Sequence, residues 1–591
     1  MGDATPADKA PAGEAPAGEA PAGEAPAGEV PNAADATNAL ADSFWNGLLD
    51  LSPITATMLG YEQGMDRLDD PGPEGRDRAR TLLRETLAEA EVIAAQAAET
   101  MGLPVEERIT LDILRVVCEI ELEQQDQRID RLKVVDQMEG PQTMLPQLAA
   151  FQPTETPQQI DAFLARIADY PRFMAANANL VGEGLAGGLT AARIVTERVI
   201  GQLERLQAIP DDRSPIVEAL KLPQPTDRDR VIDAIGKYVR PAERHFLEAL
   251  QGRYLEASRE EPGLCSAPHG DELYKTQIRA WTSLDIDAAE LHRIGLEELD
   301  VIHAEQREIA LNLGLGEELR AARAALRRDP AAIPESVEEL VNRARGQIER
   351  AMARAPGYFG TLPRAGCEVR PVEPYKEADA PAAYYYPPAI DGSRPGIYYV
   401  NTYDLPSRSY VGLASMSFHE AVPGHHLQIA LQAEHPSLNA FRRLGSRMAG
   451  MAYVEGWGLY AERLADEMGL FLNQAERFGM LDGQAHRAAR LVVDTGIHAF
   501  RWTRQKSIAQ LLDAGQSETE ANIETDRYIC WPGQALCYKT GQREITRLRK
   551  EAESALGARF DIKAFHDAVL GHGTLPLATL AKELPGWLAA G

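Results

Sequence analysis

Leucine, isoleucine and valine recur at three- and four-residue spacing along most of the chain from Phe44 onward. This spacing places apolar side chains on one face of a helix, and residues such as Pro and Gly separate the successive stretches. The stretches are 76–101, 104–131, 157–180, 191–208, 229–258, 285–313, 334–353 and 439–469. The pattern therefore predicts a mainly α fold.

One segment, residues 369–404, departs from the helical pattern. It contains three consecutive tyrosines at 384–386, a turn-rich stretch at 391–396, and the run Ile-Tyr-Tyr-Val at 397–400. Aromatic and β-branched runs bounded by turn residues are typical of strands. We expect a small β-sheet with a hairpin here, directly before the segment that is richest in reactive side chains.

The amino-terminal 36 residues differ in composition from the rest of the chain. The unit Pro-Ala-Gly-Glu-Ala begins at Pro11, Pro16 and Pro21, and a last copy runs from Pro26 to Val30. A segment with almost no large apolar side chains cannot offset its chain entropy. We therefore predict a disordered tail over residues 1–36 and a single helical catalytic domain over 37–591, with two lobes around a cleft as one arrangement.

The charge balance limits the classes of partner. The chain has 61 Lys and Arg against 89 Asp and Glu, a formal charge of -28, whereas nucleic-acid affinity depends on clustered Lys and Arg. No run approaches the roughly 20 apolar residues needed to cross a bilayer, and the start lacks the layout of a secretory signal. We expect a cytoplasmic protein that binds neither nucleic acid nor membrane. Its 5 scattered cysteines predict reduced core thiols without disulfides.

The segment FHEAVPGHHLQ at residues 418–428 carries most of the predicted chemistry. A zincin helix uses His-Glu-x-x-His, because the four-residue spacing places two imidazoles on one face and leaves the Glu to act on water. Here Pro423 stands at the expected second His. Removal of Pro423 and Gly424 restores the motif, so we predict a bulged helix with His419 and His425 as ligands and Glu420 as general base.

An alternative second ligand is His426. It lies seven residues after His419, on the same face of an unbroken helix but about 10.5 Å further along the axis. We therefore prefer His425 and give His426 an outer-sphere or substrate role. A purely structural interpretation, in which these histidines cap a helix junction, is less favoured because three of the 12 His residues fall within eight positions beside a Glu.

Candidates for a third ligand lie in the run MAYVEGWGLYAE at residues 451–462. Glu455 has aromatic and apolar neighbours, where an unpaired carboxylate is costly, so a nearby cation explains it. Glu462 lies seven residues later on the same helical face and is either a supporting partner or a solvated residue. We predict Glu455 as the third metal ligand.

Two later segments contain candidate transition-state stabilisers. His498 follows Gly496 within an apolar run, and Asp494 could hold its ring; a buried His satisfied by that Asp is the equal alternative. In the segment 526–539, the hydroxyl of Tyr538 could donate to an oxyanion, and Arg527 or Lys539 could hold a substrate carboxylate. Aromatic residues outside a motif more often belong to the core.

Three motifs stand together in this chain: HExxPGHH at 419–426, EGWxxYxE at 455–462 and RYIxWPGQAxxYKxG at 527–541. In these motifs and in the opening stretch 44–70 the sequence resembles a large bacterial family known as a domain of unknown function. The resemblance implies a helical, zinc-peptidase-like fold related in style to the gluzincins, with a cleft between two helical halves. It says less about the substrate, because a fold does not fix a function.

These observations lead to one working hypothesis, hydrolysis of a peptide or related amide bond with Zn²⁺ as cofactor. Zinc would polarise the carbonyl and lower the pKa of water, Glu420 would transfer the proton, and His498 or Tyr538 would stabilise the oxyanion. The strand containing Tyr399 and Asn401 could pair with an extended substrate. The alternatives are a metal-dependent hydrolase of a non-peptide amide or ester, and a non-catalytic helical scaffold. The sequence leaves the oligomeric state open.

Overall fold

The computed structural model describes residues 32–99, 102–373, 377, 380–389, 392 and 394–590. Within these residues the chain is mainly helical and has one small sheet, which confirms the predicted mainly α fold, whereas the zinc-peptidase-like fold stays a prediction. The repeat tail up to residue 31 lies outside the described residues. Helix α1 (Ala33–Leu51) begins within the last part of the predicted tail, because the side chain of Asn32 accepts hydrogen bonds from the first free backbone N–H groups.

The first half of the chain forms an extended series of helices. They are α2 (Pro53–Met58), α3 (Pro73–Ala98), α4 (Val105–Asp126), α5 (Asp130–Lys133), α6 (Pro141–Ala149), α7 (Pro157–Gly187), α8 (Arg193–Ala208), α9 (Pro215–Ala219), α10 (Pro225–Ala234), α11 (Arg240–Leu250) and α12 (Arg253–Ala257). The single helix predicted over 229–258 is wrong. A π-helical turn (Ile235–Val239) joins α10 to α11, and Gly252, with φ of 67°, separates α11 from α12.

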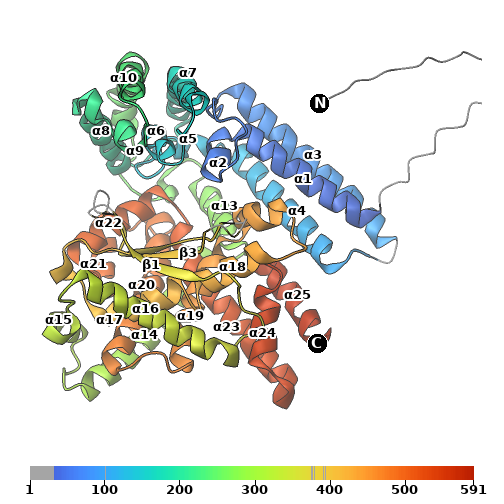
Figure 1. Cartoon of the computed structure of the whole chain (residues 1–591), viewed down its shortest axis with the longest axis vertical. Coiled ribbons are helices and arrows are strands. Elements are labelled where there is room, and N and C mark those ends of the chain that lie inside the picture. Colours follow the sequence, from blue (N-terminus) through green and yellow to red (C-terminus); the bar gives the residue numbers. More distant parts are fainter. Residues whose placement is uncertain are drawn as a thin grey trace, which may run out of the picture.

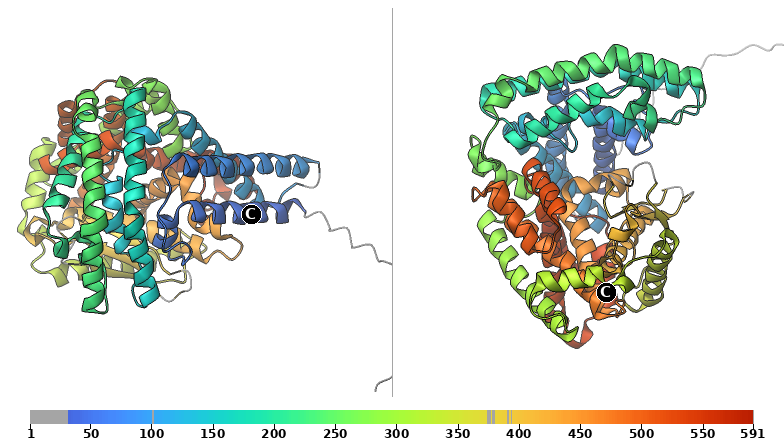
Figure 2. Two further views of the ribbon diagram at one scale, coloured as in Figure 1. Left: turned by 90° about the horizontal axis from the view of Figure 1, so that it is seen from above. Right: turned by 90° about the vertical axis from the view of Figure 1, so that its left-hand side faces the viewer.

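The second half contains the helices α13 (Gly270–Thr282), α14 (Ala288–Asn312), α15 (Leu319–Arg328), α16 (Val337–Arg354), α17 (Tyr410–Glu420), α18 (His425–Glu434), α19 (Met451–Glu467), α20 (Gln474–His498), α21 (Arg504–Asp513), α22 (Glu518–Cys530), α23 (Cys537–Leu556), α24 (Ile562–Leu570) and α25 (Leu577–Ala590). Helices α6 to α10 gather at one end of the molecule, and the helices after α14 form the opposite end (Figures 1 and 2). The predicted helix 439–469 begins later than expected, since a π-turn (Phe441–Gly445) and a 3-10 turn (Ser446–Ala449) precede α19.

The segment 369–404 contains strands, as predicted. Strands β1 (Cys367–Pro371), β2 (Ala383–Tyr386) and β3 (Gly396–Val400) form a sheet of order β1-β3-β2. The antiparallel pair β2 and β3, with Tyr384 opposite Tyr399, confirms the hairpin, and β1 runs parallel to β3. In Figure 1 the sheet lies beside α16, α17 and α18.

The position of β3 contradicts one prediction about the substrate. This strand is central and pairs on both edges, so the backbone around Tyr399 cannot also pair with a peptide. Asn401, which follows the strand, is 1% exposed. Its side-chain amide donates to the carbonyl oxygens of Ala380 (2.9 Å) and Pro381 (3.1 Å), and its Oδ1 accepts from the Tyr403 N–H (2.9 Å). Asn401 therefore fixes a loop and has no capacity left for a substrate.

Two large hydrophobic clusters form most of the core. The first contains Phe418 of α17 and Trp457 of α19, and the second contains Val492 of α20. Helices α17 and α20 join the clusters by close backbone approach: a Cβ on Gly479 of α20 would lie 1.8 Å from the carbonyl oxygen of Val411. The helices of the predicted site thus lie deep in the core. Their division into two lobes around a cleft stays a prediction.

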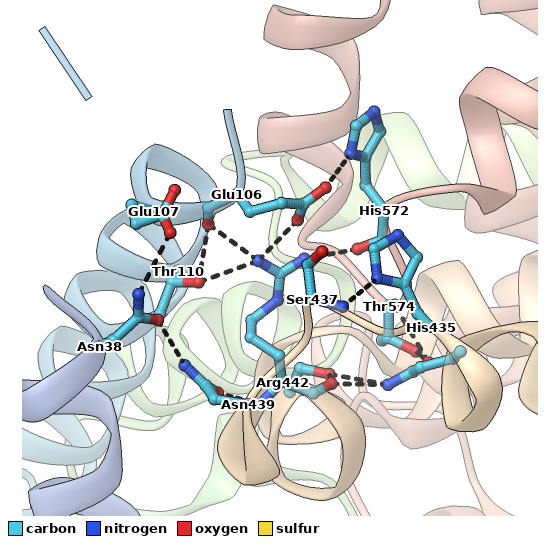
Figure 3. Close-up of polar contacts among 12 residues, drawn as sticks. Asn38, Glu106, Glu107, Thr110, His435, Ser437, Asn439, Arg442, His572 and Thr574 are labelled. Carbon is cyan, nitrogen blue, oxygen red and sulfur yellow. Dashed lines mark hydrogen bonds and ion pairs between the residues drawn. The ribbon is translucent and has the colours of Figure 1, made fainter. Parts of the chain in front are cut away.

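A buried arginine anchors the far end of α18 (Figure 3). Arg442 is 1% exposed and donates to the carbonyl oxygen of Glu106 (3.1 Å), to Thr110 Oγ1 (3.0 Å) and to the carbonyl oxygen of His572. Its own carbonyl oxygen accepts from the side-chain amide of Gln432 on α18 (2.7 Å). The network therefore fixes α18 against α4 and the segment before α25, although these elements are far apart in sequence.

All five cysteines are free, which confirms the expected lack of disulfides. Cys118 and Cys537 are buried, whereas Cys265, Cys367 and Cys530 are partly exposed. The prediction of core thiols therefore holds for two of the five.

Candidate metal centre

The Pro-Gly insertion breaks the helix instead of bulging it. Helix α17 ends at Glu420 and α18 begins at His425, with residues 421–424 as a short loop between them. A Cβ on Gly424 would lie 1.9 Å from the carbonyl oxygen of His419, so only glycine fits this turn. The indole N–H of Trp457 holds the loop by donating to the carbonyl oxygen of Pro423 (3.0 Å). With the helix broken at this point, the imidazole ring of His425 lies beside that of His419.

Three potential ligand atoms meet at this break. Oε2 of Glu455 on α19 lies 3.8 Å from Nε2 of His419 and 3.7 Å from Nε2 of His425. One ligand atom from each of the three residues lies within 4.8 Å of the others. The imidazole rings are nearly perpendicular, at 85°, with centroids 4.7 Å apart. The side chains are buried, with exposed fractions of 5%, 10% and 16% for His419, His425 and Glu455.

Gly458 gives the two rings their space. A Cβ at this position would lie 2.8 Å from Cε1 and Nε2 of His419 and 3.0 Å from Cε1 of His425. Helix α19 therefore presents the carboxylate of Glu455 to the two histidines and, one turn later, a bare backbone against which both rings pack. Gly458, at one of the unspecified positions of the motif at 455–462, thus has a steric explanation.

The donor set fits a zinc ion. Zinc–ligand distances of 2.0–2.2 Å place tetrahedral ligand atoms about 3.4 Å apart, slightly less than the distances from Glu455 to the two histidines. These distances are too long for hydrogen bonds, and a buried carboxylate is costly without a bonded partner. Two His nitrogens and one Glu oxygen are also a known catalytic zinc set. A divalent cation would satisfy all three groups together.

The electrostatics of the cluster also favour a cation. Burial alone would lower the pKa of His419, but the nearby carboxylate of Glu455 and the hydrogen bond to Glu462 outweigh burial and raise the pKa to about 9. Burial alone would raise the pKa of Glu455, but His419 and His425 lower it well below its ordinary value. The carboxylate of Glu455 is therefore ionised, and the cluster attracts one positive charge, either a proton on Nε2 of His419 or a metal ion in its place.

Glu462 supports His419 from the side away from Glu455. Its Oε1 accepts from Nδ1 of His419 (2.8 Å), and its Oε2 accepts from Ser415 Oγ (3.0 Å) and the Gln484 amide (3.1 Å). The carboxylate is 2% exposed. Because Glu462 holds a proton on Nδ1, Nε2 is the atom of His419 that would bind a metal ion in place of its own proton. This is the supporting position that the sequence allowed for Glu462.

Replacement of Glu462 by glutamine is expected to weaken zinc binding by about 10- to 100-fold, the usual effect of removing an outer partner of a histidine ligand. The amide keeps the size of the side chain but loses the charge that orients the ring. Titration of the metal-free protein against a zinc chelator measures the change. Glu467→Gln, on the exposed end of α19 and paired with Arg549, is the matched control. Equal affinities for Glu462→Gln and the wild type would contradict this role.

Glu420 lies next to His419 at the end of α17 and is partly exposed. Among the described residues its carboxylate makes no hydrogen bond, whereas Glu462 is hydrogen-bonded to His419 and Glu455 lies between the two histidines at 3.7–3.8 Å. Its negative charge contributes to the raised pKa values of His419 and Tyr398, which places it near the cluster. Glu420 is thus the carboxylate of the site that is available to accept a proton.

His426 does not belong to the cluster. Its Nε2–H donates to the carbonyl oxygen of Ala365 (3.0 Å), and its Nδ1 accepts from the hydroxyl of Tyr385 on β2 (2.9 Å). Burial lowers the pKa of His426 to about 4, so the ring is neutral. With both nitrogens engaged, His426 joins α18 to the sheet, and His425 is the histidine that faces Glu455.

The predicted role of His498 is wrong. Its Nδ1 accepts from the Leu264 N–H (3.2 Å), and its Nε2–H donates to the carbonyl oxygen of Tyr528 (2.9 Å). Asp494 does not hold this ring, since it accepts from the Tyr274 hydroxyl (2.6 Å) and the Gly533 N–H (3.1 Å). His498 is fully buried, and burial lowers its pKa to about 3. It is a structural residue with no group free for a substrate.

Asp494 is expected to make stability depend on pH. Burial raises its pKa to about 7, against hydrogen bonds from Tyr274 and Gly533 that lower it. Between pH of about 4, near the unfolded pKa, and about 7, the folded state binds more protons, so stability falls as pH rises. We expect the melting temperature of Asp494→Asn, relative to the wild type, to increase over this range. A difference that stays constant with pH would contradict the buried acid.

Tyr538 and Arg527 lie outside the three-residue cluster. Tyr538 is 9% exposed, and its ring centroid lies 4.4 Å from the guanidinium carbon of Arg490. Arg527 donates to Oε1 of Gln534 (2.9 Å) and pairs with Glu524 (3.4 Å). Tyr538 nevertheless lies in the first turn of α23, next to Cys537. Burial and the negative charge of Glu455 raise the pKa of Cys537, so this turn lies close enough to Glu455 to feel its charge.

Sequence reasoning missed several residues that shape this region: Ser415, Gly458, Gln484, Arg487 and Arg490. The last three repeat at three-residue spacing on α20, whose other residues in this stretch are mostly buried and apolar. Polar side chains on the buried face of a helix are the signal that could have identified them.

Comparison with known proteins identifies relatives over nearly the whole chain. The family described as "Bacterial protein of unknown function (DUF885)" matches residues 53–584. A crystal structure from Colwellia psychrerythraea, provisionally described as a lipoprotein, is 27% identical with a TM-score of 0.85, covering 95% of this chain and 100% of its own. A similarly described protein of unknown function from Shewanella oneidensis is 19% identical with a TM-score of 0.74, covering 92% and 99%. No curated protein sequence matches the chain.

The described helices include none that is both long and apolar enough to span a bilayer. The cytoplasmic location expected from the sequence stays a prediction.

Proposed function

Because the chain belongs to the DUF885 family of bacterial proteins of unknown function, its own residues have to indicate its chemistry, and we propose that it is a zinc-dependent hydrolase that cleaves peptide bonds. The observation that carries the proposal is the convergence of His419, His425 and Glu455 within 4.8 Å. A purely structural metal site has no need of a further free carboxylate, and Glu420 supplies one beside His419. This pairing favours catalysis over a scaffold role.

His419 and His425 would hold the ion through Nε2, and Glu455 would hold it through a carboxylate oxygen. When bound, zinc supplies a Lewis acid for the substrate carbonyl and lowers the pKa of water. Glu462 keeps the proton of His419 on Nδ1, so that Nε2 remains a ligand. The protein thus prepares the site before the substrate arrives.

Glu420 performs the proton transfers in this proposal. It accepts the proton of the attacking water as the new C–O bond forms. It then donates this proton to the leaving nitrogen as the C–N bond breaks, so that the carboxylate returns to its starting state. A residue at the end of a helix, with no hydrogen bond among the described residues, is suited to both steps.

The hydroxyl of Tyr538 is the remaining candidate for stabilising the oxyanion, since His498 is excluded by its own hydrogen bonds. Helices α19 and α23 are in close contact at two glycines, since a Cβ on Gly456 of α19 would lie 2.4 Å from the backbone of Gly541 on α23. Tyr538 is one helical turn before Gly541, and Glu455 precedes Gly456. The two side chains therefore extend from neighbouring points of the helix pair.

A zinc-loaded assay against a mixed peptide library, read by mass spectrometry, tests the proposed function. We expect cleavage products that disappear after chelation and return when zinc is restored. Cleavage of esters or other amides without cleavage of any peptide would favour a non-peptide hydrolase. A purified protein that neither binds zinc nor turns over any substrate would favour the scaffold alternative.

A further inference from the structure

Three arginines converge beside the predicted metal centre. Arg487 and Arg490 lie one turn apart on α20, and Arg527 lies on the adjacent α22. Arg490 is 5% exposed; its Nε donates to the Tyr528 hydroxyl and its Nη2 to Oε2 of Glu524, both at 2.9 Å. Arg527 pairs with the other oxygen of Glu524 (3.4 Å). We call these three arginines the arginine cluster.

The arginine cluster has more hydrogen-bond donors than there are acceptors around it, and more guanidinium groups than ion-paired carboxylates. Nη1 of Arg490, Nε of Arg487 and Nε of Arg527 are buried and have no hydrogen-bond partner among the described residues. Arg487 makes one bond, to the carbonyl oxygen of Gly483 on its own helix (3.4 Å). A buried N–H group without an acceptor is costly, so an anion that accepts from these three nitrogens would stabilise the arrangement.

The neighbouring side chains do not neutralise this charge. Burial and the charge of Arg490 keep the pKa of His486 well below its ordinary value, and burial raises the pKa of Tyr528, so both are neutral. Glu524 is shared by two of the arginines. Glu462 lies beside Arg487 and is hydrogen-bonded to His419. Among the described residues, Glu524 is therefore the one carboxylate that forms an ion pair with any of the three guanidinium groups.

The cluster is contiguous with the metal centre. A Cβ on Gly483 would lie 3.4 Å from Nη1 of Arg487 and 3.5 Å from Oε2 of Glu462, which shows that these two groups are neighbours. The ring centroid of Tyr538 lies 6.0 Å from the guanidinium carbon of Arg487 and 4.4 Å from that of Arg490. A continuous series of side chains thus leads from His419 to Arg490.

We propose that the arginine cluster binds a carboxylate of the peptide substrate, and that this contact makes the protein act close to a carboxylate-bearing end of its peptide. The proposal rests on the proposed hydrolase function. Guanidinium groups donate charge-assisted hydrogen bonds to carboxylates, and the buried nitrogen without a partner on each of the three arginines supplies such a donor. The carboxylate is either the C-terminus or an acidic side chain, and the two sources predict different peptide preferences.

Binding of a matched pair of tripeptides, one with a free C-terminal carboxylate and one with a C-terminal amide, tests the proposal. Calorimetry on the Glu420→Gln variant reads binding without turnover. We expect the free acid to bind at least tenfold more tightly than the amide. An amidated tripeptide with a terminal Asp distinguishes the two sources, because tight binding of this peptide assigns the cluster to an acidic side chain. Equal affinities for all three peptides would overturn the proposal.

Arg487→Gln and Arg527→Gln, each added to the Glu420→Gln variant, test which residues are responsible. Both side chains are only partly buried, so the fold should survive, and melting temperatures verify this. We expect the preference for the carboxylate to fall towards onefold in both. Arg293→Gln, an exposed arginine of α14 paired with Glu290, removes the same charge and should keep the preference. Unchanged preference in both cluster variants would refute the proposal.

A chain that prefers the free acid but cleaves no peptide would keep the carboxylate site and refute only the hydrolase function. The reverse result, peptide cleavage without any preference for a carboxylate, would refute only the arginine cluster as a binding site. The two proposals therefore fail independently.

Discussion

Replacement of Glu420 by glutamine is expected to lower kcat for peptide hydrolysis by about 10²- to 10⁴-fold, the contribution typical of a positioned general base. The amide has nearly the same size but cannot accept the proton of the attacking water. Since Glu420 is not a ligand in the proposed site, the zinc content should stay at the wild-type level. Steady-state kinetics and elemental analysis of the same preparation measure both quantities.

The matched control for this variant is Glu434→Gln on α18, a carboxylate held by the backbone N–H groups of Arg364 and Ala365. It removes a glutamate charge from the neighbouring helix at a position away from the metal cluster. Substantial turnover in Glu420→Gln, with zinc bound, would overturn the general-base assignment. Loss of zinc in this variant would instead show that Glu420 acts as a ligand.

Replacement of His425 by alanine is expected to remove zinc and, with it, all zinc-dependent turnover. The variant deletes one of three protein ligands, so the loss in affinity should exceed the 10- to 100-fold effect of an outer partner. His426→Gln should retain zinc, because the ring of His426 is engaged by Ala365 and Tyr385. Titration against a chelator compares the two variants directly.

The adjacent histidines thus provide an internal control for the interpretation of the motif. If His426→Gln loses zinc and His425→Ala keeps it, His426 is the second ligand, and the helix break does not serve to bring His425 to the metal. If both lose zinc while remaining folded, the ligand set includes more than one histidine from α18. Melting curves distinguish either result from general unfolding.

The local part of the site was predictable from the sequence. The spacing of His419, Pro423 and His425 indicated two ligands around an interruption, and the apolar neighbours of Glu455 indicated a carboxylate that needs a cation. The sequence did not predict that the helix would break completely. That outcome depends on the close contact of Gly424 with the carbonyl oxygen of His419 and on the hydrogen bond from Trp457, 34 residues away along the chain.

The errors came from residues whose partners are distant in sequence. The segment around His498 allowed an oxyanion role or a buried histidine held by Asp494, but its Nδ1 accepts from Leu264, 234 residues away along the chain. Tyr399 lies in β3, whose two edges are paired with β1 and β2. The sequence does not show that β3 is the central strand, so its backbone was predicted to be open to a substrate. Arg490 was not predicted as a site residue, because its hydrogen-bond partners Glu524 and Tyr528 lie on another helix, 34 and 38 residues away along the chain.

Anomalous diffraction at the zinc absorption edge, from crystals of the zinc-loaded protein, tests the central claim most directly. The account predicts one peak per chain between Nε2 of His419, Nε2 of His425 and the carboxylate of Glu455, at about 2.0–2.2 Å from each. A crystal with full zinc loading but no peak at this position, or with the two imidazole rings turned away from Glu455, would contradict it.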